Sequence, residues 1–412
     1  MTLRLLFLGD RIIGGVSAYT KIMYETCTRL AKENYKIAHI PMGRANKMGI
    51  QNFQNVLVYP SGNHPFAEDI AIEHYLNFKA DMLITIKEPW VFNNIYQWAI
   101  NFVPFCPIDH SPVSPFMTSK LHTAFKVIAI SRFGQRELKE AGIESVYIPH
   151  GVDCELYRPL PEHKSECKKM FGLPPDDFTV GMVAMNRSRK MIPRMLRGYT
   201  RFRELNPDVK THMMLWTDIR PAGEFEESPF GVADVSVDLL PEIMQLGLGE
   251  AVIWPDRKLV TQGLPEWTSE DYKTGWDMVK LYNSFDVLLL CSGGEGFGMP
   301  LLEAQACGVA PITTDYAAGP EVAGVGLTVE PADYVIINTP GTRFALASID
   351  GMAEALTRIY NADREKLAKR ARSFAERYDW KKIISDYWKP FLEQCKTELY
   401  PLVKKEGVSS WA

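Results

Sequence analysis

The stretch with the richest chemistry is CSGGEGFGMPLLEAQACG, from Cys291 to Gly308. It follows the apolar run at 287–290, and Pro300 suits the first turn of a helix that we expect to begin near Met299. The amides at a helix start attract an anion, and the glycines let the backbone approach a ligand closely. Glu295 precedes the expected helix and Glu303 lies on its second turn, where ionised carboxylates accept hydrogen bonds from hydroxyl groups. The plain alternative is a glycine turn with one surface and one helical glutamate.

A basic cluster comes directly after the strand-like run at 179–185. It contains Arg187, Arg189 and Lys190. Fixed cations in a water-poor cleft stabilise a departing diphosphate more in the transition state than in the ground state. The alternative, a solvated basic helix start, would place these charges at the positive end of a helix dipole, where an anion is favoured. The cluster therefore predicts a phosphate site.

Two histidines follow strand-like runs in the first half of the chain. His110 ends the run at 103–108, and its place between Asp109 and Ser111 favours a site histidine over a core one. Asp109 is either its partner or a turn former. His150 follows the run at 146–148. It is either an interdomain hinge residue or an acceptor-side residue, and we favour the structural role.

Three further segments lie after strand-like runs. Gly14 and Gly15 follow the first run without forming Gly-x-Gly-x-x-Gly, which disfavours a dinucleotide site. Residues 87–90 and 254–257 also follow strand-like runs and are weaker candidates for contacts with a ligand. No Asp-x-Asp follows a strand in a donor-binding context, and no Gly-x-Ser-x-Gly occurs, so neither a metal site nor a serine nucleophile is supported.

Apolar runs alternate with helical patterns along the chain, which predicts parallel sheets covered by helices. The helical patterns include 16–33, 91–101 and 131–141. The strand-like runs fall into two series, separated by a polar, Pro-rich stretch at 157–175. They are residues 3–8, 36–40, 56–59, 82–85, 103–108, 127–130 and 146–148, then 179–185, 211–216, 252–254, 287–290, 310–313 and 326–329. We therefore expect an α/β fold of two Rossmann-like, doubly wound domains that face each other across a cleft holding the ligand.

Composition sets the remaining bounds. The 412 residues carry a net charge of -4, which argues against a nucleic-acid partner. The seven scattered cysteines argue against a disulfide framework and a structural zinc site. Neither a signal peptide nor a run of about 20 apolar residues is present, which predicts a cytoplasmic protein. Docking on the inner membrane face stays open, without a polybasic run to support it, and so does the oligomeric state.

The segment from Cys291 to Gly308 resembles the Glu–seven residues–Glu signature of retaining GT-B glycosyltransferases, and glycosyltransferase family 4 in particular. Residues 310–327, His150-Gly151-Val152-Asp153 and Ile130-Ser131-Arg132-Phe133 continue this pattern. The similarity covers most of residues 1–385 and is more specific in the second half. It implies an acceptor domain at 1–158, a donor domain at 159–385 and a last helix at about 386–412 that packs back on the first domain.

The resemblance also implies roles for individual residues. Glu295 would bind sugar hydroxyls and Glu303 the ribose, while His110 would lie near the reacting sugar carbon. Residues 254–257 would lie beside the nucleotide base, and residues 87–90 are a weaker candidate for the acceptor pocket. Lys190 matches the phosphate-binding lysine, but Ala184-Met185-Asn186 replaces the family's Gly-Arg-Leu triplet, so either Arg187 or Arg189 takes over the arginine's role. The backbone amides expected at the sugar or diphosphate belong to Gly14, Gly15, Gly296, Phe297, Gly298 and Met299.

The expected activity is therefore transfer of a hexosyl unit from a nucleoside diphosphate sugar, with retention, to a hydroxyl of a glycan, a lipid or a small molecule. No cofactor or metal is expected, because the donor is itself a substrate and lysine, arginine and helix dipoles replace a metal. No carboxylate is placed as a covalent nucleophile, which favours front-face substitution. The alternatives are a nucleotide-sugar epimerase or hydrolase on the same scaffold, and a non-catalytic nucleotide-sugar-binding protein.

Overall fold

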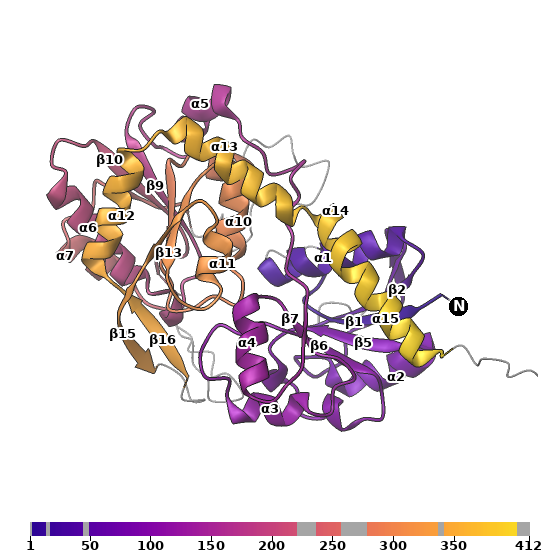
Figure 1. The fold of residues 1–412 in the computed structure, drawn as a ribbon. Helices are drawn as coiled ribbons and strands as arrows, with labels where there is room; N and C mark the ends of the chain where they lie inside the picture. The colour runs from indigo at the N-terminus through magenta and orange to yellow at the C-terminus, as the bar shows by residue number, and fades with distance from the viewer. Residues whose placement is uncertain are drawn as a thin grey trace, which may run out of the picture.

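The computed structural model describes residues 2–13, 17–43, 49–220, 236–256, 278–336 and 342–401. Within these residues the strands form an eight-stranded sheet, a six-stranded sheet and a separate two-stranded hairpin. Figure 1 shows the two larger sheets in separate halves of the molecule, each with helices packed around it. The expected α/β fold with two Rossmann-like units is confirmed. We call the halves that carry the eight-stranded and the six-stranded sheet the first and the second domain.

The first sheet has the strand order β3-β4-β2-β1-β5-β6-β7-β8. Neighbouring strands are parallel except for β3 and β4. The central strands are buried at nearly every position, which explains their continuous apolar runs. The strands are β1 Arg4–Gly9, β2 Lys36–Pro41, β3 Gln51–Phe53, β4 Val56–Val58, β5 Met82–Ile86, β6 Phe102–Cys106, β7 Ile128–Ala129 and β8 Val146–Tyr147.

Serine caps begin three of the helices that cover this sheet. The hydroxyls of Ser17, Ser114 and Ser131 each accept a hydrogen bond from a backbone amide in the first turn, which satisfies a donor that has no partner within the helix. The helices are α1 Ala18–Lys32, α2 Glu68–Phe78, α3 Pro115–Leu121 and α4 Arg132–Glu140.

The helix expected at residues 91–101 is wrong. Two short 3₁₀ turns, Pro89–Val91 and Ile95–Gln97, stand in its place. The buried carboxylate of Glu68 accepts hydrogen bonds from the amides of Asn93, Asn94 and Ile95. The Glu68 carboxylate thus satisfies the backbone amides between the two turns. These amides therefore need no hydrogen bonds within a helix, although the apolar periodicity of the segment suggested one.

The second sheet is parallel throughout, with the order β11-β10-β9-β12-β13-β14. Its strands are β9 Phe178–Val183, β10 Thr211–Trp216, β11 Val252–Ile253, β12 Val287–Leu290, β13 Pro311–Thr314 and β14 Leu327–Val329. Its helices are α5 Lys164–Met170, α6 Ile192–Leu205, α7 Leu240–Gln245, α9 Met278–Asn283, α10 Met299–Ala306, α11 Gly319–Ala323 and α12 Ile349–Tyr360. The position near 158, where the domains are predicted to divide, lies in the connection between β8 and β9. The polar sequence of residues 220–236 predicts a long surface loop, and nearly all of it lies outside the described residues.

An antiparallel hairpin that the sequence reasoning missed projects from the second domain. It consists of β15 Pro331–Ile336 and β16 Arg343–Ala347, and in Figure 1 it stands apart from the six-stranded sheet. β15 is mostly exposed, so it lacks the buried apolar run by which the other strands are recognised. A single bridge joins Arg343 of this hairpin to Ser111 of the first domain.

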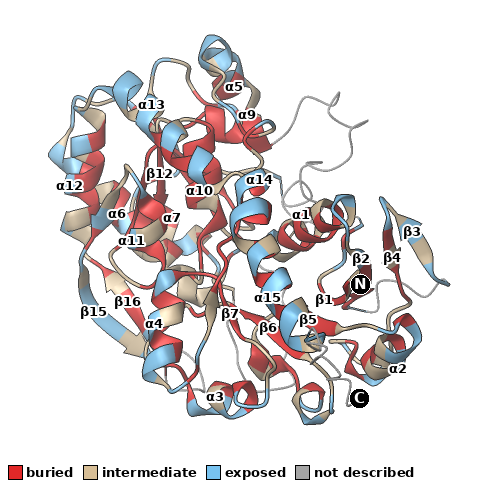
Figure 2. Cartoon of the chain, turned by 45° about the vertical axis from the view of Figure 1, so that its right-hand side comes forward, coloured by how far each residue is buried: buried red, intermediate tan, exposed pale blue. Residues whose placement is uncertain are grey.

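The tail returns from the second domain to the first, as the yellow helices of Figure 1 show. It comprises α13 Arg364–Ala375, α14 Trp380–Ile383, a π-helical turn at Ile384–Trp388 and α15 Lys389–Leu399. Trp388 is fully buried, with its ring centroid 6.2 Å from that of Phe7 and 5.6 Å from that of Phe105. In Figure 2 the visible sides of α14 and α15 are largely exposed, while Trp380, Ile383, Phe391, Leu392 and Cys395 of these helices are buried. These contacts tie the end of the chain to the core of the first sheet.

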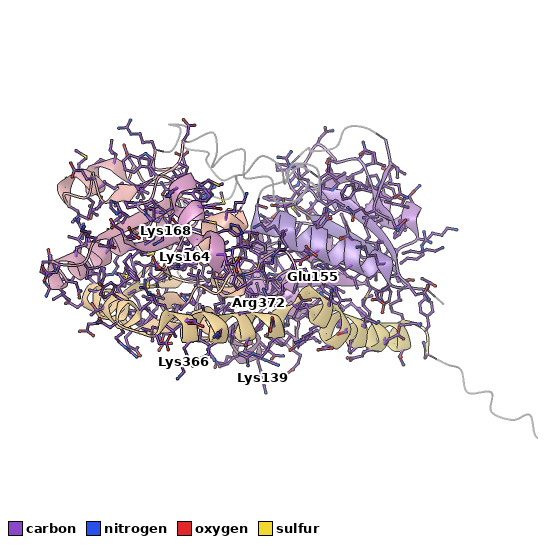
Figure 3. All side chains as sticks on the ribbon, turned by 90° about the horizontal axis from the view of Figure 1, so that it is seen from above. Lys139, Glu155, Lys164, Lys168, Lys366 and Arg372 are labelled. Carbon is purple, nitrogen blue, oxygen red and sulfur yellow. The ribbon has the colours of Figure 1, made fainter. Side chains whose placement is uncertain are left out.

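Arg372 of α13 anchors this crossover to the segment that connects the domains. Its guanidinium donates hydrogen bonds to the carbonyls of Cys154, Tyr157 and Ala306. Figure 3 shows Arg372 and Glu155 near the middle of the molecule, beside the crossing helices. The connecting segment is therefore held on one side by the tail.

Candidate active site between the two domains

The glycine-rich stretch forms the loop from β12 to α10. The helix begins at Met299, as expected, with Pro300 in its first turn and Gly298 at its N-cap. Gly298 has φ +93°, a left-handed conformation that favours glycine. Phe297 and Met299 are buried. The local pattern of turn glycine, proline and apolar helix residues thus fixes where the helix starts.

The glycines of this loop allow the two domains to meet. A Cβ on Gly294 would lie 2.0 Å from the carbonyl oxygen of Asp109, and one on Gly296 would lie 3.0 Å from Cβ of Pro107. Asp109 and Pro107 belong to the first domain and come just after β6. In this closed arrangement the missing side chains make room for the backbone of the other domain.

Lys190 and Glu295 form the centre of the site. The Nζ of Lys190 lies 2.6 Å from Oε1 of Glu295, and the hydroxyl of Ser292 donates to the same oxygen at 2.9 Å. Burial raises the pKa of the Glu295 carboxyl, but Lys190, Arg189 and Ser292 outweigh it and hold that pKa below its ordinary value. Glu295 is therefore ionised and ready to accept hydrogen bonds.

Arg189 crosses from the second domain to the first. Its Nη1 lies 3.4 Å from Oδ2 of Asp109 and donates to the carbonyl of Gly294 at 3.2 Å. Burial raises the pKa of the Asp109 carboxyl, while the hydrogen bond with His110 and the charges of Arg189 and Lys190 lower it below its ordinary value overall. Arg187 is half-buried just before the 3₁₀ turn Ser188–Lys190. Of the two candidate arginines, Arg189 lies in this cluster of charges.

His110 is buried beside Asp109, with its Nδ1 2.8 Å from Oδ1 of that residue. Because a carboxylate only accepts, Nδ1 carries a proton, and in the neutral form of the ring Nε2 is the acceptor. Nε2 is buried and has no hydrogen-bond partner among the described residues. Phe344 of the hairpin lies against the ring, with centroids 6.3 Å apart. The structure thus brings His110 into the same cluster as Lys190 and Glu295.

Glu303 is held by groups from both domains. Its Oε2 accepts from the hydroxyl of Tyr282 at 2.6 Å, and its Oε1 accepts from Nζ of Lys21 at 3.0 Å. Lys21 lies on α1 of the first domain and was not singled out by sequence reasoning. It lies five residues after Val16 in the sequence, has no motif of its own and is 282 positions from Glu303. Its position shortly after the Gly14-Gly15 sequence motif was the one feature of the sequence that placed it near a candidate site.

The remaining candidates divide into three groups. His150 lies between Phe105 and Phe297, at 5.1 Å from each ring, and burial lowers its pKa to about 3, which fits the structural interpretation. The pair Gly14 and Gly15 lies outside the described residues. Trp254 lines a cavity of about 560 Å³ at the ends of β10 and β11, on the side where a base was expected.

A polar cluster beside the site comes from the first domain. The hydroxyl of Tyr19 donates to Oε1 of Glu88 at 2.7 Å, and Nζ of Lys87 lies 3.8 Å from Oδ1 of Asp10. Burial and Glu88 raise the pKa of the Tyr19 phenol well above its ordinary value, and Arg189 opposes this rise, so the cluster is within electrostatic range of Arg189. Tyr19 thus links Glu88 to the neighbourhood of Arg189, and the acceptor-side role of residues 87–90 stays a prediction.

Within the described residues, no group of three or more His, Cys, Asp or Glu side chains is arranged to hold a metal ion. The helices of the described part of the chain include none long and apolar enough to cross a membrane.

The fold and this junction define the GT-B class, in which two Rossmann-like domains face each other across a ligand site. The sequence profile described as "Glycosyl transferases group 1" matches residues 272–374. A D-inositol 3-phosphate glycosyltransferase of Stackebrandtia nassauensis is 26% identical over 240 residues, which are 58% of this chain and 46% of that protein. The chain is thus similar to the group 1 glycosyltransferases, and the profile match lies in its second domain. It spans about half the length of the curated relatives it matches.

Two solved structures show the same fold over nearly the whole chain. Sucrose-phosphate synthase from Thermosynechococcus elongatus aligns with a TM-score of 0.69 at 15% identity, covering 97% of this chain and all of that one. Anabaena HepE in complex with UDP and glucose aligns with a TM-score of 0.67 at 17% identity, covering 95% of this chain and all of that one. At such identities the likeness concerns the fold.

Proposed function

We propose that the chain transfers a hexosyl unit from a nucleoside diphosphate sugar to a hydroxyl acceptor, with retention and without a metal. The observation that carries this proposal is the cluster of Lys190, Arg189, Glu295, Asp109 and His110 at the domain junction. The profile match and the UDP- and sugar-bound neighbour support the donor class. The inositol phosphate relative supports a polyhydroxyl acceptor class without fixing its identity.

The proposed role of the cations is to hold the diphosphate. Lys190 and Arg189 give up their contacts with Glu295 and Asp109 and bind phosphate oxygens. Because both cations already lie at the domain junction, with the side chains of Arg189 and Lys190 26% and 13% exposed, little reorganisation accompanies the growth of negative charge on the leaving group. The two positive charges of Lys190 and Arg189 take the place of a divalent metal ion.

Once released, Glu295 accepts hydrogen bonds from the hydroxyls of the transferred sugar. The acceptor nitrogen Nε2 of His110 takes a further sugar hydroxyl, while Asp109 keeps the ring in this tautomer. In the transfer step the bond from the anomeric carbon to the phosphate oxygen breaks, and the acceptor oxygen bonds to the same face. The acceptor's proton passes to the leaving phosphate oxygen, which balances the charge. Closure of the two domains excludes water.

The test is to incubate the protein with UDP-, GDP- and ADP-hexoses, with sugars and polyols as acceptors, in the presence of a chelator. Proton NMR of the product reports the anomeric configuration. An inverted product, or loss of transfer on chelation, would contradict the retaining or the metal-independent part of the proposal. Release of free sugar or an epimer without any acceptor would favour the epimerase or hydrolase alternative instead.

A further inference from the structure

Lys21 donates a hydrogen bond to Glu303, the carboxylate that we expect to bind the donor's ribose. Its ammonium, from the first domain, donates to Oε1 of Glu303 in the second domain, and the two side chains are 12% and 4% exposed. Tyr282 already holds the other oxygen of Glu303. An ionised carboxylate offers only acceptor positions, so ribose hydroxyls compete with Lys21 for this buried group.

The same lysine contacts the segment that connects the domains. The Nζ of Lys21 donates to the hydroxyl of Tyr157 at 3.0 Å, and the carbonyl of Tyr157 accepts from Arg372 on the returning tail. Lys21 therefore joins α1, the connecting segment and α10 at one point. In Figure 1, α1 and α10 lie on opposite sides of the domain junction.

Resting on the proposed function, we propose that Lys21 is a positioning residue that holds Glu303 while the donor site is empty and is displaced by the ribose hydroxyls. The ammonium holds the carboxylate in place and links the two domains at this point. When a nucleotide binds, its ribose replaces Lys21 at Glu303, and Lys21 keeps its hydrogen bond to Tyr157. Donor affinity thus includes the free energy of breaking the bond between Lys21 and Glu303.

The experiment is a thermodynamic cycle that compares two proteins and two ligands. Calorimetry measures the four dissociation constants, and no sugar transfer is involved. UDP, GDP and ADP are first compared, and the tightest binder is then paired with its 2′,3′-dideoxy form. The wild-type chain is compared with Lys21→Met, which keeps most of the side-chain stem. Lys32→Met, at an exposed position on the last turn of the same helix, is the matched control.

Lys21→Met is expected to bind the ribose form roughly tenfold or more tightly than the wild type, because a charge-assisted hydrogen bond no longer competes. It is expected to bind the dideoxy form as the wild type does, since that ligand leaves Glu303 untouched. A residue that only stabilises the fold would shift both affinities alike or neither. Equal shifts, or weaker binding of the ribose form, would overturn the proposal.

Lys21→Gln provides a second variant should Lys21→Met not fold. It keeps an uncharged donor near Glu303, so an intermediate ribose preference is expected, and an unchanged preference overturns the proposal. A wild-type chain that binds none of the three diphosphates would instead contradict the proposed function. The two failures are therefore distinguishable.

Discussion

The ammonium of Lys190 lies 2.6 Å from the carboxylate of Glu295, although the two residues follow different strands of the second sheet. Arg189 makes a second pair with Asp109, and Lys21 makes a third with Glu303. The second and third pairs join residues of different domains. The charged groups of the three pairs thus neutralise one another in this structure, and we expect donor binding to exchange their partners.

Replacing Lys190 with alanine is expected to lower kcat by about 10²- to 10³-fold, because a fixed charge at the leaving diphosphate is lost. Steady-state transfer assays measure the effect, with circular dichroism to establish that the variant folds. Lys366→Ala, at an exposed position on α13, is the control and is expected to keep full activity. A folded Lys190→Ala enzyme with wild-type kcat would refute the role given to this residue.

Alanine at position 294 is expected to push the domains apart. Its Cβ would lie 2.0 Å from the carbonyl oxygen of Asp109, closer than real Cβ contacts occur. Because the clash is between domains, each domain keeps its own core, while transfer activity is expected to fall at least tenfold as the junction opens. Small-angle scattering would show a larger radius of gyration.

The control for this variant is Gly249→Ala, where the nearest atom to an added Cβ is the sulfur of Met244 at 3.9 Å. It is expected to match the wild type in activity and in scattering. If Gly294→Ala also behaved as the wild type, the closed contact between Gly294 and Asp109 would not be part of the active form.

His150 is expected to make the protein less stable in mild acid. Burial lowers its pKa from 6.5 to about 3, so its contribution is fully present above pH 6.5 and is lost as the pH falls toward 3. Between pH 7 and pH 5 this amounts to about 2 kcal/mol of unfolding free energy. His39 is buried in the same way and acts in the same direction.

Urea unfolding at pH 7 and at pH 5 measures this effect. His150→Phe places an apolar ring between Phe105 and Phe297, so its loss of stability over this range should be about 2 kcal/mol smaller than that of the wild type. His122→Phe, at an exposed position, should leave the wild-type difference unchanged. An unchanged pH dependence in His150→Phe would mean that this imidazole is charged in the folded protein.

The sequence predicted those parts of the fold that depend on local patterns. Buried parallel strands such as β5 and β12 are continuous apolar runs, and the start of α10 is marked by Gly298 and Pro300. The exposed strand β15 has no such run and was missed. The helix predicted at 91–101 failed because Glu68, distant in sequence, satisfies that backbone.

The candidate site was predicted to a similar extent. Motifs located Lys190, Glu295, Glu303 and His110, because each follows a strand and has a chemical type suited to a diphosphate sugar. They did not distinguish Arg187 from Arg189, since that choice depends on which side chain faces Asp109. Lys21 could not be predicted from the sequence either. Its partner Glu303 lies in the other domain, and only the packing of the two domains brings the side chains together.

The returning tail is expected to contribute strongly to the stability of the first domain through Trp388. Its indole is fully buried against Phe7 and Phe105, so Trp388→Ala removes a large apolar side chain from a closed core and should cost about 3 to 5 kcal/mol of unfolding free energy. Trp388→Phe, which keeps a ring in the cavity, should cost less. Leu76→Ala, at a side chain that is 66% exposed, should change little. Urea denaturation followed by circular dichroism measures all three, and a loss below about 1 kcal/mol for Trp388→Ala would show that the tail can detach without disturbing the core of the first sheet.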